Sequence, residues 1–150
     1  MTNWKAPDHT TVTAFVVCRG AEKSLEFANT VFGAKVLGEP LRRSSGEIWN
    51  AVAKIDDTTL MFAEAESEMM HRPAFLYVFV EDADATFEKA IAAGGSPMMQ
   101  PADQFYGNRD GGVEDPAGNW WWIATYKEDI PHEELQRRAR EVERQRAGGE

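Results

Sequence analysis

The sequence has little cysteine and histidine, and it has no long apolar run. The single cysteine, Cys18, stands in the apolar stretch TVTAFVVC and has no second cysteine to pair with, so we expect a small buried core residue. No run of about 18 apolar residues occurs, and residues 1–10 carry no apolar signal segment. These absences predict a cytoplasmic protein without membrane association.

Positive charge is also scarce. Lysine and arginine together number 16 against 25 acidic residues, which gives a net charge of −9. Nucleic acids and anionic membranes select proteins with a positive surface, so neither is an expected partner. The 150 residues, 43% of them hydrophobic, suffice for a single domain, 1–150, with a substantial core.

The stretch from Asp103 to Tyr126 predicts a β-hairpin. Pro116 presets the backbone for a turn corner, and Gly118 can take a positive φ on leaving the turn. Three adjacent tryptophans then favour a strand over residues 120–126. Because side chains alternate along a strand, Trp120 and Trp122 share one face, and we expect both faces of this strand to be buried.

The order of elements is the same in the two halves of the chain. In the first half we predict strands over 11–18, 34–41, 47–55 and 59–65 and a helix over 21–32; in the second, strands over 74–80, 96–104, 107–114 and 120–126 and a helix over 84–93. An offset of 62 residues superimposes the halves and pairs Gly33 with Gly95.

A tail helix over 129–146 follows, with Asp129 as its expected cap. It is either a solvated helix docked by one edge or an arm that packs in a dimer. The predicted class is therefore α+β, with one βαβββ unit over 11–65, a second over 74–126, and a C-terminal helix.

Together with the two units, the turn Asp115-Pro116-x-Gly118 and the run Tyr106-Gly107-x-Arg109 resemble the vicinal oxygen chelate superfamily of glyoxalase I, bleomycin resistance proteins and extradiol dioxygenases. The chain is most similar to the glyoxalase-like branch sometimes labelled 3-demethylubiquinone methyltransferase-like. No glycine-rich loop opens a helix, which argues against methyltransferase activity. The resemblance implies curved mixed sheets, a small-molecule site in each cup, a homodimer and, in many members, a divalent metal held by His and Glu.

The metal-ligand positions of the family carry no ordinary ligands here. The resemblance places them on Thr13 or Phe15, Phe75 or Tyr77, Leu60 or Phe62, and Trp122. One carboxylate cannot hold such an ion against water, so Glu64, alone on its strand face, does not make a site. We therefore expect no tightly bound metal and no other cofactor.

Aromatic residues occupy the expected cup instead. Phe15, Phe75, Tyr77, Trp120 and Trp122 project from different strands toward one region, where they either fill the core or line a cavity for a flat or cationic organic ligand.

Four polar residues are further candidates for ligand contacts: Tyr77, Asn50, Tyr106 and Arg109. Arg109 has an alternative role in pairing with Asp110, Glu114 or Asp115. No Ser/His/Asp triad is recognisable, and catalytic residues stay unassigned.

The sequence thus predicts a homodimeric glyoxalase- or bleomycin-resistance-like protein that binds a small organic molecule without a tightly held metal. Two alternatives stay open. One is a metal-dependent lyase, isomerase or dioxygenase that uses Glu64, Glu47 or His9. The other is an interaction module whose aromatic face forms a dimer interface.

Overall fold

The computed structural model describes residues 4–149. The first unit contains β1 (Ala14–Cys18), α1 (Ala21–Phe32), β2 (Lys35–Val36), β3 (Leu41–Arg42), β4 (Ile48–Ile55) and β5 (Thr58–Glu64). A short 3-10 helix, η1 (Glu68–Met70), leads to β6 (Phe75–Phe79), α2 (Ala83–Ala92), β7 (Ser96–Asp103), β8 (Asn108–Glu114), β9 (Trp120–Tyr126) and α3 (His132–Gly148). The predicted α+β class, with two mixed sheets and a C-terminal helix, is confirmed.

Each unit forms its own sheet. The first has the order β1-β5-β4-β2, with β3 paired to β4, and the second has the order β6-β9-β8-β7. In each unit, the strand that comes first in the sequence pairs in parallel with the strand that comes last, β1 with β5 and β6 with β9. The offset of 62 residues relates β5 to β9 at both ends. One prediction was wrong: the strand over 34–41 divides into β2 and β3, because Gly38 with φ 70° interrupts the extended backbone.

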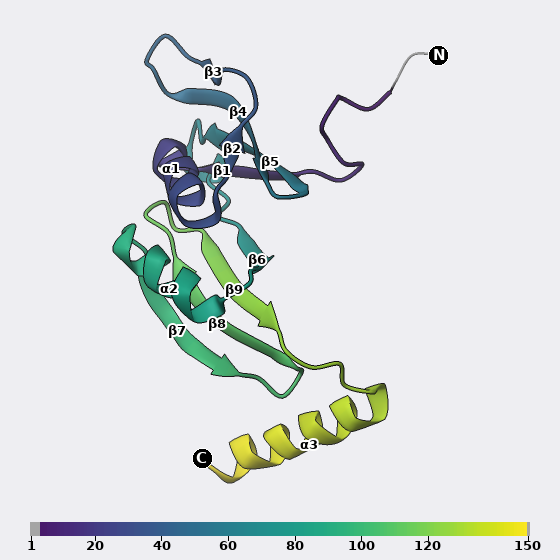
Figure 1. The fold of residues 1–150 in the computed structure, drawn as a ribbon. Coiled ribbons are helices and arrows are strands. Elements are labelled where there is room, and N and C mark those ends of the chain that lie inside the picture. Colours follow the sequence, from purple (N-terminus) through teal and green to yellow (C-terminus); the bar gives the residue numbers. More distant parts are fainter. Residues whose placement is uncertain (1–3, 150) are drawn as a thin grey trace.

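The helices lie on corresponding faces of the two sheets and contact each other (Figure 1). Residues of both units share one hydrophobic cluster. At its centre Trp121 of β9 stacks on Phe32 of α1, with 5.0 Å between ring centroids, and also packs near Phe27. Cys18 is fully buried in this cluster, as the sequence predicts. The core therefore fixes the second sheet against the first helix.

The turn Asp115–Asn119 joins the units through buried hydrogen bonds. The Asp115 carboxylate accepts from Ser24 Oγ of α1 at 2.7 Å and from the indole N–H of Trp121 at 2.9 Å. It also accepts from the backbone N–H groups of Ala117 and Asn119 within the turn. Buried polar groups need partners, so this turn has a structural role at the contact between α1 and the second sheet.

The face of each sheet opposite its helix is open. On β9, Trp121 and Ile123 are buried, whereas Trp120 and Tyr126 are exposed. On β6, Phe75 and Phe79 are 60% and 61% exposed. The expectation that strand 120–126 is buried on both faces was therefore wrong for the single protomer, because a helix covers only one face of the sheet.

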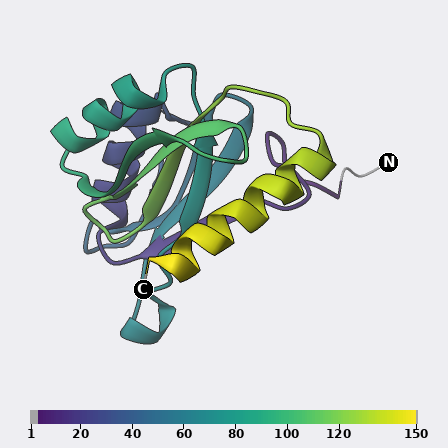
Figure 2. The ribbon, with the colours of Figure 1, turned by 90° about the horizontal axis from the view of Figure 1, so that it is seen from below.

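Helix α3 has no buried residue. It lies below the second sheet in Figure 1 and crosses in front of the sheets in the view from below (Figure 2). Arg138 holds it to the second unit by an ion pair with Glu128 at 2.6 Å and a hydrogen bond to the Phe105 carbonyl. The predicted Asp129 cap was wrong, since the helix begins at His132 after Pro131 and no side chain caps it. Among the helices of residues 4–149, none is long and apolar enough to cross a membrane.

Candidate functional site

The open face of the second sheet carries a continuous aromatic layer. Register places Phe75 opposite Trp120 and Tyr77 opposite Trp122, so these side chains project to the same side. Phe75 lies 4.9 Å from Trp122 and 5.5 Å from Trp120, centroid to centroid. Tyr77 packs edge-on against Phe79 at 5.3 Å, which continues the layer along β6. We call these five rings the aromatic layer.

The layer depends on a glycine of the neighbouring strand. The ring of Trp122 lies over Gly112 of β8, where a Cβ would come within 2.5 Å of the indole. Any larger residue at position 112 would push the ring away, since atoms do not approach this closely without displacement. Gly112 thereby keeps Trp122 flat against the sheet.

A polar cluster lies beside the aromatic layer. The side chain of Asp110 on β8 is fully buried, and its Oδ2 accepts a hydrogen bond from the Tyr77 hydroxyl at 2.7 Å and another from the Tyr106 hydroxyl. Asn108 donates from Nδ2 to the Tyr77 oxygen at 3.0 Å. Register places Ala124 of β9 opposite Asp110 and Trp122 opposite Tyr77, so the hydroxyl of Tyr77 reaches Asp110 diagonally across β9. We call these four residues the tyrosine–aspartate cluster.

The environment keeps both phenols protonated. Burial is the largest cause that raises the pKa of Tyr77, followed by its hydrogen bond to Asp110. The same two causes raise the pKa of Tyr106 further, in the same order. A phenol that donates to a carboxylate loses that interaction on deprotonation, so both hydroxyls act as hydrogen-bond donors to Asp110.

The structure brings five of the eight predicted binding residues together and separates three. Phe75, Tyr77, Trp120 and Trp122 belong to the aromatic layer, and Tyr106 reaches its edge through Asp110. Phe15 and Asn50 lie on the open face of the first sheet, where Phe15 faces Met61 and Asn50 Nδ2 lies 3.9 Å from Met61 Sδ.

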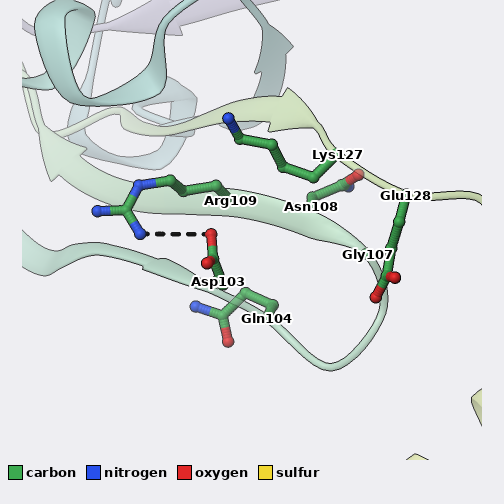
Figure 3. Close-up of a pocket in the computed structure, with 7 residues that line it drawn as sticks. All are labelled: Asp103, Gln104, Gly107, Asn108, Arg109, Lys127 and Glu128. Carbon is green, nitrogen blue, oxygen red and sulfur yellow. Dashed lines mark hydrogen bonds and ion pairs between the residues drawn. The ribbon is translucent and has the colours of Figure 1, made fainter.

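Arg109 projects from the opposite face of β8. Its guanidinium binds both carboxylate oxygens of Asp84 on α2, at 2.6 and 2.9 Å, and pairs with Asp103 at 3.3 Å. These partners differ from the acids expected from the sequence. The arginine borders an open polar hollow of about 620 Å³ that Gln104, Asn108 and Lys127 also line (Figure 3). The side chain of Arg109 therefore lies on the face of β8 opposite the aromatic layer.

Asp110 and Asn108 were missed from the sequence as site residues. Strand alternation could have found them, because Asn108, Asp110 and Gly112 share the face of Trp122. The place of Asp110 next to Arg109 in the sequence indicates only an ion pair. Arg109 and Asp110 are adjacent in sequence, and their side chains therefore point to opposite faces of β8.

A sequence comparison identifies the family of this chain. The profile of the Glyoxalase/Bleomycin resistance protein/Dioxygenase superfamily matches residues 6–123, most of both βαβββ units. The chain belongs to this superfamily. An uncharacterized protein of Mycobacterium tuberculosis is 26% identical over 132 residues, which cover 81% of this chain and 77% of that protein.

Solved structures of superfamily members share the fold. A family enzyme from Burkholderia phytofirmans gives a TM-score of 0.63 at 19% identity, over 76% of this chain and 96% of that one. TioX from Micromonospora gives 0.60 at 22% identity, over 77% and 98%. A Bacillus cereus protein provisionally assigned as a 3-demethylubiquinone-9 3-methyltransferase gives 0.61 at 17% identity, over 77% and 99%. At these identities the likeness concerns the fold alone.

The residues of this superfamily member do not fit the divalent metal that the sequence resemblance implies. Within residues 4–149, no three His, Cys, Asp or Glu side chains come close enough to hold one ion. The Glu64 carboxylate instead accepts from the backbone N–H groups of Gly20 and Ala21 at the start of α1. Glu47 is exposed in the turn before β4, and His9 lies near Pro7 before β1. These three candidate ligands are thus in separate places.

Proposed function

We propose that this superfamily member binds a small organic molecule on the aromatic layer of the second sheet. The observation that carries the proposal is the exposure of several mutually packed rings beside hydrogen-bonding groups. Isolated apolar residues are common on surfaces, but an exposed contiguous patch of this kind is typical of a binding site. Flat rings stack on such a layer, and the neighbouring hydroxyls orient the ligand.

A hollow beside the layer supports the proposal. It has a volume of about 360 Å³ and lies at the edge strand β6, where Tyr77 and Phe79 line it together with Leu60 and Thr58 of the first unit. This volume lies within the range of about 300–1,000 Å³ that small-molecule sites occupy. A ligand on Tyr77 can therefore extend toward the first unit.

A second copy of the chain would complete the site. An open sheet face covers a ligand on one side only, whereas small-molecule sites bury most of the ligand surface. The chain also exposes apolar side chains on the open face of its first sheet, where Phe15 is 48% exposed. We therefore include a homodimer in the proposal, with the first sheet of one protomer facing the aromatic layer of its partner.

Binding can be tested by calorimetry with a set of aromatic compounds and the variant Trp122→Leu. Loss of the indole should weaken the tightest binder at least about fivefold, because base-sized aromatic stacking contributes about 1–3 kcal/mol. Trp49→Leu is the control, since it removes the same indole from a more exposed position on β4. Equal affinity of wild type and Trp122→Leu for every compound would contradict the proposed site.

Metal content distinguishes this proposal from a metal-dependent lyase, isomerase or dioxygenase. Elemental analysis should be made on protein purified without chelators and without metal-affinity resin. Because the site offers aromatic rings in place of metal ligands, we expect a negligible content of zinc, nickel, iron or manganese. About one equivalent of any of these per chain would favour the enzyme and would require ligands from more than one protomer.

A further inference from the structure

The carboxylate of Asp110 lies on the open face beside the aromatic layer, and its side chain is fully buried. One of its two oxygens has no hydrogen-bond partner. Both phenolic donors bind Oδ2, and Oδ1 has no hydrogen-bond partner. In the described part of the chain no lysine, arginine or histidine forms an ion pair with it. A buried carboxylate without a cation is costly, and buried unpaired groups are rare in folded proteins. The structure therefore places a carboxyl group with one unused acceptor oxygen directly behind the two tyrosines.

The two tyrosines can offer only acceptor positions to a ligand. Each phenol has a single hydroxyl proton, and both protons are directed at Asp110. The Tyr77 oxygen already accepts from Asn108 Nδ2, so each of the two oxygens has only lone-pair positions left for a further partner. The side chains of both tyrosines are exposed, at 42% and 37%, so a ligand can approach the cluster from the open face. A ligand group that complements them must donate hydrogen bonds.

Charge and ring geometry select the same kind of ligand. The π faces of Phe75, Trp120 and Trp122 attract cations, and Glu114 at the edge of the layer accepts from the Trp120 indole at 3.2 Å. The nearest arginine along the strand, Arg109, lies on the other face and is neutralised by Asp84 and Asp103. An anionic ligand would meet carboxylates and acceptors without a compensating cation.

We propose that the ligand of the aromatic layer is a flat organic cation with N–H donors, such as an amidinium or a protonated aromatic amine. Its ring stacks on Trp122 and Phe75, and its N–H groups donate to the oxygens of Tyr77 and Tyr106. The charge of Asp110 stabilises the cation through the two hydroxyls. This inference rests on the proposed function and adds the chemical class of the ligand to it.

Three probes with one ring system test the inference: 2-naphthamidinium, 2-naphthamide and 2-naphthoate. They are planar and nearly isosteric, and they differ in charge. Calorimetry at neutral pH should give the tightest binding for the amidinium, about tenfold tighter than the amide, with the naphthoate weakest. Higher salt should weaken binding of the amidinium more than that of the amide.

Variants locate the preference. Asp110→Asn should reduce the amidinium-to-amide ratio to near one while the amide affinity stays the same. Because this substitution alters a buried group, Tyr106→Phe provides a second test. It removes one acceptor and should lower amidinium affinity several-fold, with a smaller loss for the amide, whose N–H donors carry no charge. Asp103→Asn is the control, since this acid lies on the same hairpin but faces Arg109.

The outcomes separate the two proposals. The predicted order in the wild type, lost in Asp110→Asn or Tyr106→Phe, supports a cation site. Equal binding of the three probes, or tightest binding of the naphthoate, overturns the cation inference and leaves the aromatic site standing. Absence of binding for all three probes overturns the inference and contradicts the proposed function with it.

Discussion

At the scale of single residues, the tyrosines report most directly on the site. The chain has three tyrosines, and the pKa of each is raised above its ordinary value of about 10. Tyr126 is exposed, and its pKa is raised by partial desolvation of the phenol, followed by the charge of Asp129 and a hydrogen bond to it. Tyr77 and Tyr106 share the carboxylate of Asp110, so their titration depends on the tyrosine–aspartate cluster.

We expect little tyrosinate in the folded protein at about pH 10, where free tyrosine is half ionised. A group whose pKa is raised by folding contributes stability that is complete below its unfolded pKa and is lost as pH rises through its folded pKa. The free energy of unfolding should therefore fall above about pH 10. Ultraviolet difference absorbance and urea unfolding at several pH values check both expectations.

Tyr106→Phe provides the matched comparison. Its absorbance titration should lack the component with the highest pKa, because Tyr106 has the larger shift. Three normal titrations near pH 10 in wild type, of which the variant loses one and keeps two, would contradict the assigned hydrogen bonds to Asp110.

At the scale of elements, α1 begins in an unusual way. Gly20 occupies the N-cap in a left-handed conformation and no side chain at that position caps the helix. Glu64 at the end of β5 accepts from the N–H groups of Gly20 and Ala21, and so satisfies donors that the cap usually serves. The end of one strand thus fixes the start of the helix.

Glu64→Ala should lower the free energy of unfolding by about 1 kcal/mol, the usual contribution of a helix cap. Glu64→Gln retains an acceptor oxygen and should lose less. Urea unfolding of the three proteins tests the ranking. An alanine variant as stable as wild type would show that water replaces the carboxylate without loss.

The turn Asp115–Asn119 should contribute more, because its hydrogen bonds are buried. Asp115→Ala leaves Ser24, Trp121 and two backbone N–H groups without their acceptor. We expect the free energy of unfolding to fall by about 3 kcal/mol, since each buried orphan donor costs about 1–3 kcal/mol before relaxation. Thermal unfolding measures the effect. Asp103→Ala, an exposed acid on the neighbouring hairpin, should leave the midpoint unchanged, and an equal effect of both substitutions would contradict the turn's structural role.

At the scale of the whole molecule, the two open faces set the expected assembly. The proposed dimer predicts a particle of twice the 16.8 kDa chain mass in light scattering after size-exclusion chromatography. Phe79→Glu places a charge on the open face beside Tyr77 and should shift the particle toward the monomer with unchanged circular dichroism.

Val36→Glu is the control for the dimer. Val36 is also an exposed apolar residue, but it pairs with Ala53 on the helix side of the first sheet and should leave the dimer intact. A wild-type particle of single-chain mass would refute the dimer and leave the aromatic layer open to solvent.

The sequence by itself determined the order and type of the elements. Local chemistry is sufficient for this: Pro116 and Gly118 define a turn, and aromatic and β-branched runs define strands. The duplicated pattern also led to the superfamily and to the aromatic residues of β6 and β9. The division of strand 34–41 and the start of α3 depended on backbone angles that propensity does not specify.

Only the tertiary structure decided how these residues meet. Sequence alternation groups residues by face, but it does not state which face a helix covers, and so it predicted burial where β6 and β9 are open. It placed Phe15 and Asn50 beside residues of another sheet, because pairing between sheets depends on the packing of α1 against Trp121. The contact of Tyr77 with Asp110 spans two strand spacings and crosses β9 diagonally, a relation that arises only when β6, β9 and β8 lie in register.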